Sequence, residues 1–126
     1  VGDRPRTVCD TGHNTGGWAY LSRQLRNEHY RRLHIVIGFV NDKDITHLLE
    51  MLPRNATYYF TRASVPRALD CNLLADHARE AGLQGRAYLT VAEAVAAARS
   101  SATPDDMIFI GGSTFIVADF LSLPGM

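Results

Sequence analysis

The feature that most constrains this chain is a regular alternation between short apolar runs and amphipathic segments. Three runs, at residues 33–39, 58–60 and 107–110, are almost unbroken apolar segments bounded by turn-forming residues. A strand that is covered on both faces needs continuous rather than alternating apolarity. Two weaker runs, at residues 7–9 and 86–89, bring the expected strands to five.

Helical patterns lie between these expected strands, with apolar side chains at spacings of three and four. Asp70 can cap one helix that Gly82 ends, and the Thr-Val-Ala-Glu run at residues 90–93 is a capping box that begins another. We expect helices over residues 15–29, 44–52, 71–81 and 114–121, and one that follows Thr90.

Strict alternation of strands and helices indicates an α/β fold in three layers, with right-handed crossovers and a Rossmann-like appearance. We expect about five strands, mostly parallel and flanked by helices, in the spatial order 3-2-1-4-5 when strands are numbered along the chain. A length of 126 residues fits one domain spanning residues 1–126. The chain opens with Val1 rather than Met and shows no signal-peptide pattern, so we expect a piece of a longer protein.

Charge and composition exclude several classes of protein. The chain has 13 basic and 13 acidic side chains, whereas a general nucleic-acid binder would be distinctly basic. The same balance gives no polybasic attraction to a membrane, and no apolar stretch approaches the length of a membrane span. The two cysteines and five histidines show no metal-ligand or disulfide spacing, which favours a reducing, cytoplasmic location and no bound structural metal.

Polar and glycine-rich segments collect directly after the expected strands. They occupy residues 10–17, 41–44, 61–67 and 111–114. In open α/β sheets, ligands bind outside the carboxyl ends of the strands, so these segments would line one rim. A carboxylate can hold sugar hydroxyls, and cations or a glycine–serine turn can hold an anion, which suits a nucleotide or an amino acid. The candidate residues are Asp10, His13, Lys43, Arg67 and Ser113.

Each of these residues also has a structural explanation. Asp10 can be a turn residue, Asn14 a helix cap and Lys43 a solvated charge between two aspartates. His34, inside an apolar run, is expected to be a hydrogen-bonded or edge-facing histidine rather than a ligand. The chain contains neither a GxxxxGK[ST] nor a GxGxxG motif. The residues alone therefore predict one edge of an anionic-ligand site that lacks its main phosphate-binding loop.

Four ordered motifs extend this interpretation. They read Pro-Arg-Thr-Val-Cys-Asp-Thr-Gly-His-Asn at 5–14, Gly-Phe-Val-Asn-Asp-Lys-Asp at 38–44, Pro-Arg-Ala at 66–68 and Asp-Met-Ile-Phe-Ile-Gly-Gly-Ser-Thr-Phe at 106–115. Together they resemble the C-terminal domain of folylpolyglutamate synthase / dihydrofolate synthase, within the Mur ligase superfamily. Gly12 and Thr15 depart from the usual Ala and Pro of that pattern, and the Gly-Arg segment that normally enters the domain is absent.

The resemblance implies an ATP-dependent amide ligase that joins L-glutamate to folate or dihydropteroate. ATP and Mg would be held mainly by an N-terminal ATPase domain in cis, which this chain lacks, so the chain alone would be inactive. The family's sheet also has an antiparallel strand, which we expect to be truncated here. By matching position, Asp10, Asn14 and Lys43 would bind ATP, His13 and Ser113 would bind glutamate, and Arg67 would serve the substrate's carboxylates or only the fold.

Other interpretations stay open at this point. The C-terminal domain of a peptidoglycan-precursor Mur ligase shares the general α/β plan, although His13 and the Gly-Gly-Ser-Thr-Phe run at 111–115 favour the folate branch. A non-catalytic module that binds a nucleotide or an amino acid is a second alternative. A receiver-like domain would need an acidic cluster after the first strand, which Asp10 alone does not supply.

Overall fold

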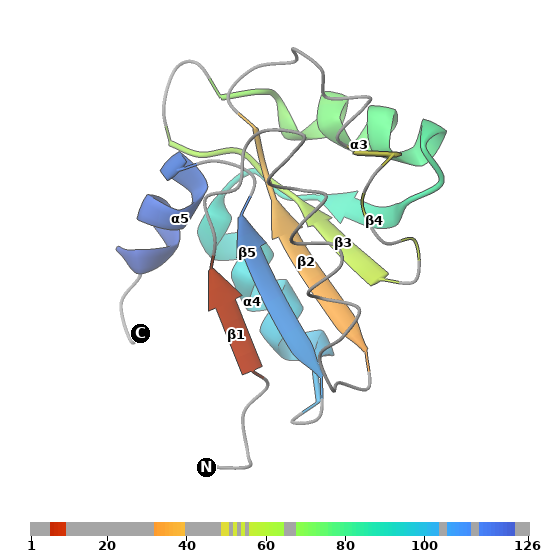
Figure 1. Ribbon diagram of the computed structural model, residues 1–126. Helices are drawn as coiled ribbons and strands as arrows, with labels where there is room; N and C mark the ends of the chain where they lie inside the picture. The colour runs from red at the N-terminus through yellow and green to blue at the C-terminus, as the bar shows by residue number, and fades with distance from the viewer. Residues whose placement is uncertain are drawn as a thin grey trace.

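The computed structural model describes residues 6–9, 32–39, 49–50, 52, 54, 56–64, 68–103, 106–111 and 114–122. Five strands form one sheet: β1 (Arg6–Cys9), β2 (Leu33–Ile37), β3 (Ala56–Phe60), β4 (Gln84–Ala87) and β5 (Met107–Gly111). Three helices accompany them: α3 (Cys71–Glu80), α4 (Val91–Ser101) and α5 (Thr114–Leu121) (Figure 1). The expected α/β fold is confirmed. The helix expected over residues 15–29 lies outside the described residues, and only residues 49–50 of that expected over 44–52 are described as helical.

The strands lie in the order β1-β5-β2-β3-β4, and every pairing among them is parallel. The expected order 3-2-1-4-5 is therefore wrong, because β5 enters between β1 and β2 and leaves β1 at an edge. Every residue of β5 and β2 is buried, as two central strands require, whereas exposed residues alternate with half-buried ones along the edge strand β4. The antiparallel strand expected from the family is not among the described pairings.

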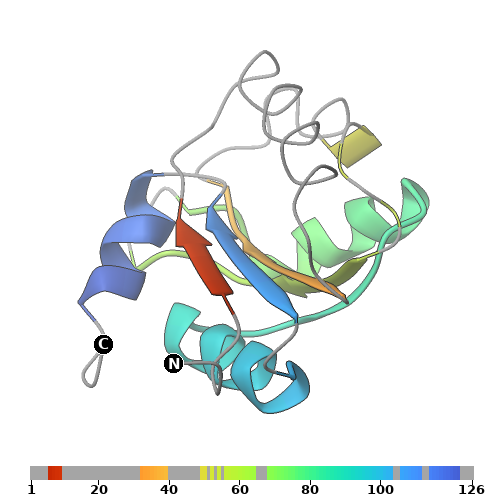
Figure 2. The same ribbon diagram turned by 60° about the horizontal axis from the view of Figure 1, so that its bottom comes forward.

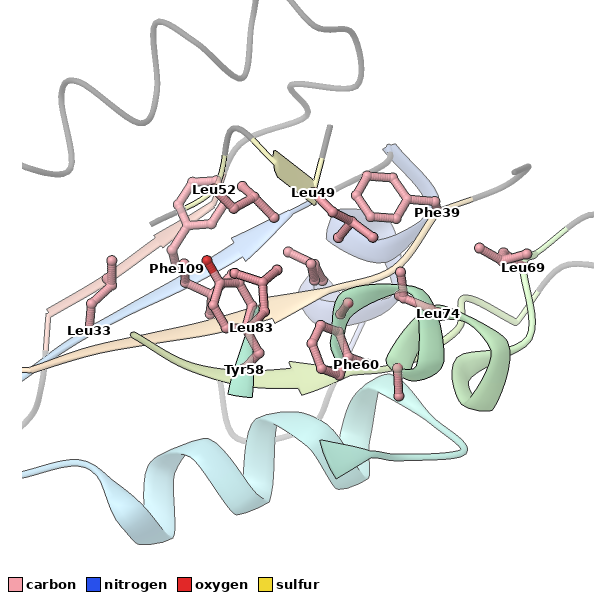
Figure 3. Close-up of a cluster of buried hydrophobic side chains, with 14 of the residues drawn as sticks. Leu33, Phe39, Leu49, Leu52, Tyr58, Phe60, Leu69, Leu74, Leu83 and Phe109 are labelled. Carbon is pink, nitrogen blue, oxygen red and sulfur yellow. The ribbon is translucent and has the colours of Figure 1, made fainter. Parts of the chain in front are cut away.

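Two hydrophobic clusters cover the two faces of the sheet. One gathers Leu33, Ile35 and Ile37 of β2 with large side chains of β3 and β5, and packs them against α3 (Figure 3). The other gathers Val36, Ile108 and neighbours against α4 and α5. Figure 2 shows α4 and α3 on opposite faces of the sheet. The alternation of side chains along β2 thus divides the core into the expected three layers.

Local capping explains where two of the helices begin. The Asp70 carboxylate accepts hydrogen bonds from the N–H groups of Asn72 and Leu73, both at 3.1 Å, and starts α3. The Thr90 hydroxyl accepts from the N–H of Glu93 at 3.1 Å and starts α4. Both caps were predicted from the sequence, because each capping side chain binds N–H groups only two or three residues further along the chain. Within the part of the chain that the structure describes, no helix has the length and apolarity needed to cross a bilayer.

Candidate functional site

The candidate site lies at the edge where the strands of the sheet end. The four polar segments follow β1, β5, β2 and β3, which are four neighbouring strands, whereas none of them follows the edge strand β4. The strands end level with one another, since Cys9 pairs with Ile110 and Ile37 pairs with both Gly111 and Phe60. The chain therefore leaves the sheet toward all four segments at the same edge, as the strand pattern predicted.

The predicted site residues themselves lie outside the described residues: Asp10, His13, Asn14, Lys43, Arg67 and Ser113. Their roles stay predictions. The structure does describe the residues that directly precede or follow several of them in the sequence. Asp10 comes directly after Cys9, the last residue of β1, and Ser113 comes directly before Thr114, the first residue of α5. Arg67 directly precedes Ala68.

Backbone hydrogen bonds continue past the ends of the strands and hold this edge. The N–H of Thr61 donates to the carbonyl of Ile37 at 2.9 Å, and the N–H of Leu69 donates to the carbonyl of Phe39 at 2.7 Å. The first bond continues the pairing of β3 with β2, and the second ties the chain before α3 to the chain after β2. The described part of the edge is thus fixed by the fold itself.

Gly38, the first residue after β2, allows a close approach at this edge. A Cβ atom on Gly38 would lie 2.5 Å from the carbonyl oxygen of Thr61 and 2.7 Å from Cδ1 of Ile116. A backbone oxygen cannot move away as a side chain can, so a larger residue would force the strands apart. Close packing therefore explains why the motif at residues 38–44 begins with glycine.

A contact joins the segment at residues 61–67 to α5, the helix that follows the last segment, and sequence reasoning missed it. The Ser64 N–H donates to Oδ2 of Asp119 at 2.7 Å, and the Ser64 hydroxyl donates to Oδ1 at 3.0 Å. Ser64 stands three residues before Arg67, and Asp119 lies on α5, which follows Ser113. The signal in the sequence is that Asp119 is the only charged residue in the apolar run of α5.

One hydroxyl at this edge is buried without a partner. Thr61 follows the last residue of β3, is 0% exposed, and its Oγ1 makes no hydrogen bond within the described structure. An unsatisfied buried hydroxyl costs about 1–3 kcal/mol. The sequence predicted a polar segment at residues 61–67, but it did not predict that the hydroxyl of Thr61 would be buried without a partner.

A second polar cluster lies near the beginning of β2, away from that edge. His34 is 1% exposed, with Nε2 2.8 Å from Oδ2 of Asp106 and Nδ1 2.9 Å from the Tyr59 hydroxyl. The expectation of a hydrogen-bonded histidine is confirmed, whereas the edge-facing alternative is wrong because β2 is central. We call these three residues the His34 cluster. No described group of His, Cys, Asp and Glu is arranged to hold a metal ion, so we assign no metal ligand to these residues.

Asp106 is the charged end of the His34 cluster. Burial alone would raise the pKa of this carboxyl, but hydrogen bonds from His34 and from the Thr103 N–H and hydroxyl, with the Arg32 charge nearby, lower it to about 2. The ionised carboxylate accepts from Nε2 of His34, which fixes the hydrogen on that nitrogen. Burial also raises the pKa of Tyr59. The cluster is therefore an internally satisfied network.

Comparisons with known proteins agree with this architecture. Residues 1–114 match the family described as Mur ligase, glutamate ligase domain. A probable bifunctional folylpolyglutamate synthase/dihydropteroate synthase of Haloferax volcanii is 33% identical over 122 residues, which are 94% of this chain and 14% of that protein. Escherichia coli FolC in complex with DHPP and ADP superposes with a TM-score of 0.83 at 29% identity, covering 96% of this chain and 29% of that one.

A third comparison includes an amino acid ligand. A bifunctional folylpolyglutamate synthase/dihydrofolate synthase with Mn, AMPPNP and L-glutamate bound gives a TM-score of 0.84 at 26% identity, covering 97% of this chain and 29% of that one. This chain thus spans less than a third of the length of each of these proteins. The resemblance to folylpolyglutamate and dihydrofolate synthases drawn from the four motifs is confirmed. The chain belongs to the Mur ligase glutamate ligase domain family.

Proposed function

We propose that residues 1–126 form the glutamate ligase domain of an ATP-dependent folate:glutamate ligase, with its ATPase domain outside this chain. One observation carries the proposal: the four family motifs lie on or after four neighbouring strands that end at a single edge of the sheet. Relatives of the same fold hold ADP with DHPP, and AMPPNP with Mn and L-glutamate. The domain closes over ATP and glutamate at a cleft between the two domains.

The proposed reaction proceeds in two steps. ATP transfers its γ-phosphoryl group to a carboxylate of folate or dihydropteroate, which gives an acyl phosphate and ADP. The glutamate amine attacks the acyl carbon, and the tetrahedral intermediate expels phosphate and loses the amine proton as the amide forms. ATP and Mg supply the activation of the carboxylate and are held mainly by the ATPase domain. This domain contributes orientation and exclusion of water.

The roles of the chain's own residues follow from their chemistry. Asp10 accepts hydrogen bonds from ATP hydroxyl or amine groups, and Asn14 and Lys43 serve the phosphate side of the cleft. His13 and Ser113 hold the incoming glutamate; Ser113 directly precedes α5 in the sequence, and the beginning of a helix stabilises an anion. Arg67 pairs with a carboxylate of the substrate. The Ser64–Asp119 contact supports this arrangement by joining the chain before Arg67 to the helix after Ser113.

We also propose a cytoplasmic location for this reaction. Within the described residues Cys71 is a free, buried thiol, and burial, with the nearby Asp70 charge adding to it, raises its pKa. Burial makes this thiol unreactive, and a cysteine without a disulfide is the usual state in a reducing compartment.

A glutamate titration of a His13→Ala variant tests the proposed function. The protein used is the gene product that carries this chain together with an ATPase domain. Loss of a hydrogen bond to glutamate should raise the KM for glutamate about tenfold while the KM for ATP changes less. Steady-state assays with each substrate varied in turn measure the two constants. An unchanged glutamate dependence would remove the role assigned to His13.

The non-catalytic alternative has its own signature. Calorimetric titration of the 126-residue chain with ATP and with glutamate should show weak binding or none, because the cleft needs both domains. Tight binding of either ligand by the chain alone, with no ligation by the longer protein, would instead favour a binding module.

A further inference from the structure

A groove of about 450 Å³ opens on the face of the sheet that α4 covers. It runs along β3 and β4 from their first residues to Tyr88, which follows β4, and reaches the last residue of α4. It therefore opens on a face of the sheet and not among the segments that follow β1, β5, β2 and β3. Its polar lining comes from Thr57, Tyr59, Gln84, Arg86, Tyr88 and Ser101. We call it the β3–β4 groove. Sites for small molecules in proteins commonly have volumes in the range of about 300–1,000 Å³.

The floor of the groove is held rigid by the His34 cluster. The Tyr59 side chain lines the groove, but the residue is only 4% exposed, and its hydroxyl is hydrogen-bonded to Nδ1 of His34. Nε2 of His34 donates to the Asp106 carboxylate, so one ring holds both the buried carboxylate and the Tyr59 hydroxyl in place. A buried network whose members are all satisfied fixes the side chains at its ends.

Among the described residues, the buried carboxylate of Asp106 beside the floor is unavailable to a ligand. The side chain of Asp106 is 0% exposed, and its oxygens accept from His34 and from Thr103. Arg32 stands 3.5 Å from the same carboxylate and donates to the Ser101 carbonyl at 3.4 Å, while its own side chain remains 55% exposed. Of these two charges in the described structure, the accessible one is therefore the positive charge of Arg32.

The rim of the groove carries hydrogen-bond donors. Alternation along the chain puts Gln84, Arg86 and Tyr88 on the same face of the edge strand, and Thr57 lies on the neighbouring strand. Arg86 is exposed and makes no ion pair with another described residue. Tyr88 is half-buried, with its ring 5.9 Å from that of Tyr59, so its position is defined by packing. A guanidinium fork with hydroxyl and amide donors beside it is suited to an oxyanion.

We propose that the β3–β4 groove binds a small molecule through a phosphate or carboxylate group, with Arg86 as the charge partner. The Tyr88 and Thr57 hydroxyls donate to the remaining oxygens of the anion, while the immobile Tyr59 ring closes the floor. The proposal is independent of the ligase function, because it uses a face of β3 and β4 and none of the residues assigned to ATP or glutamate.

A titration of the isotopically labelled 126-residue chain, followed by amide NMR, tests the groove. Inorganic phosphate is one probe and acetate the other, with chloride keeping the ionic strength constant. We expect saturable shifts of the amides of residues 84–88 and 101 with at least one probe, and the stronger probe identifies the anion. The absence of saturable shifts at these amides with both probes would overturn the proposal.

Two variants separate the groove from general charge attraction. Arg86→Gln removes the charge partner and should weaken binding about tenfold. Arg79→Gln is the matched control, because Arg79 is an exposed arginine on α3, the helix on the opposite face of the sheet. It should leave the affinity unchanged. Equal affinity of Arg86→Gln and the unmodified chain would contradict the assignment, as would equal losses in both variants.

Discussion

The carboxyl edge of the sheet and the His34 cluster both gather polar residues, but they use them in opposite ways. At the carboxyl edge, the backbone is tied down by bonds such as Thr61 to Ile37, and the motif residues stand on the segments that leave the sheet. In the His34 cluster, the polar side chains satisfy one another inside the sheet layer. We therefore expect the motif residues to be available to a ligand, whereas the residues of the His34 cluster serve the fold.

The largest effect is expected from a substitution that breaks the His34 cluster. Asp106→Ala leaves Nε2 of His34 without its acceptor in a buried place, and the Thr103 N–H and hydroxyl without theirs in a half-buried one. The free energy of unfolding should therefore fall by about 3 kcal/mol. Urea denaturation of the 126-residue chain measures it. Asp76→Ala is the control, since the exposed Asp76–Arg79 pair should contribute less than about 1 kcal/mol. Equal losses in the two variants would mean that the cluster does not stabilise the fold.

The pH dependence of stability gives a second way to test this cluster. The pKa of Asp106 falls from its ordinary 3.8 to about 2 in the folded chain. A lowered folded pKa contributes stability that is present above the unfolded value and is lost as pH falls through the folded one. The contribution is about 2 kcal/mol. The difference in unfolding free energy between the unmodified chain and Asp106→Asn should therefore shrink from pH 5 to pH 2, and a constant difference would contradict the assignment.

The smallest expected effect concerns the carboxyl edge. Asp119→Ala removes the two hydrogen bonds from Ser64, which lie at a half-exposed place, so the free energy of unfolding should fall by about 1 kcal/mol. Hydrogen exchange of the Ser64 amide should become faster while exchange in β2 and β5 stays slow. Unchanged protection of the Ser64 amide would show that the contact does not hold this segment.

The features that the sequence predicted correctly depend on residues close together in the chain. The caps at Asp70 and Thr90 act over two or three positions, and continuous apolarity marked β2 and β5 as strands covered on both faces. The site was predicted at the level of the sheet edge, because polar segments after parallel strands share that edge.

The features that the sequence could not predict depend on contacts between residues that are far apart in the chain. His34 meets partners 25 and 72 residues away, and Ser64 meets Asp119 across 55 residues. The position of β5 between β1 and β2 also depends on the direction in which each crossover connection runs along the sheet. No local sequence pattern determines that direction. The roles of the six motif residues rest on their match to the family and stay predictions.

The central claim is that this chain completes a glutamate ligase only together with an ATPase domain. The most direct measurement is ATP-dependent addition of L-glutamate to folate or dihydropteroate, compared between the gene product that carries both domains and the 126-residue chain alone. We expect phosphate release and amide product with the two domains, and neither with the chain alone. A folded two-domain protein that binds ATP but forms no glutamyl product with either substrate would contradict it.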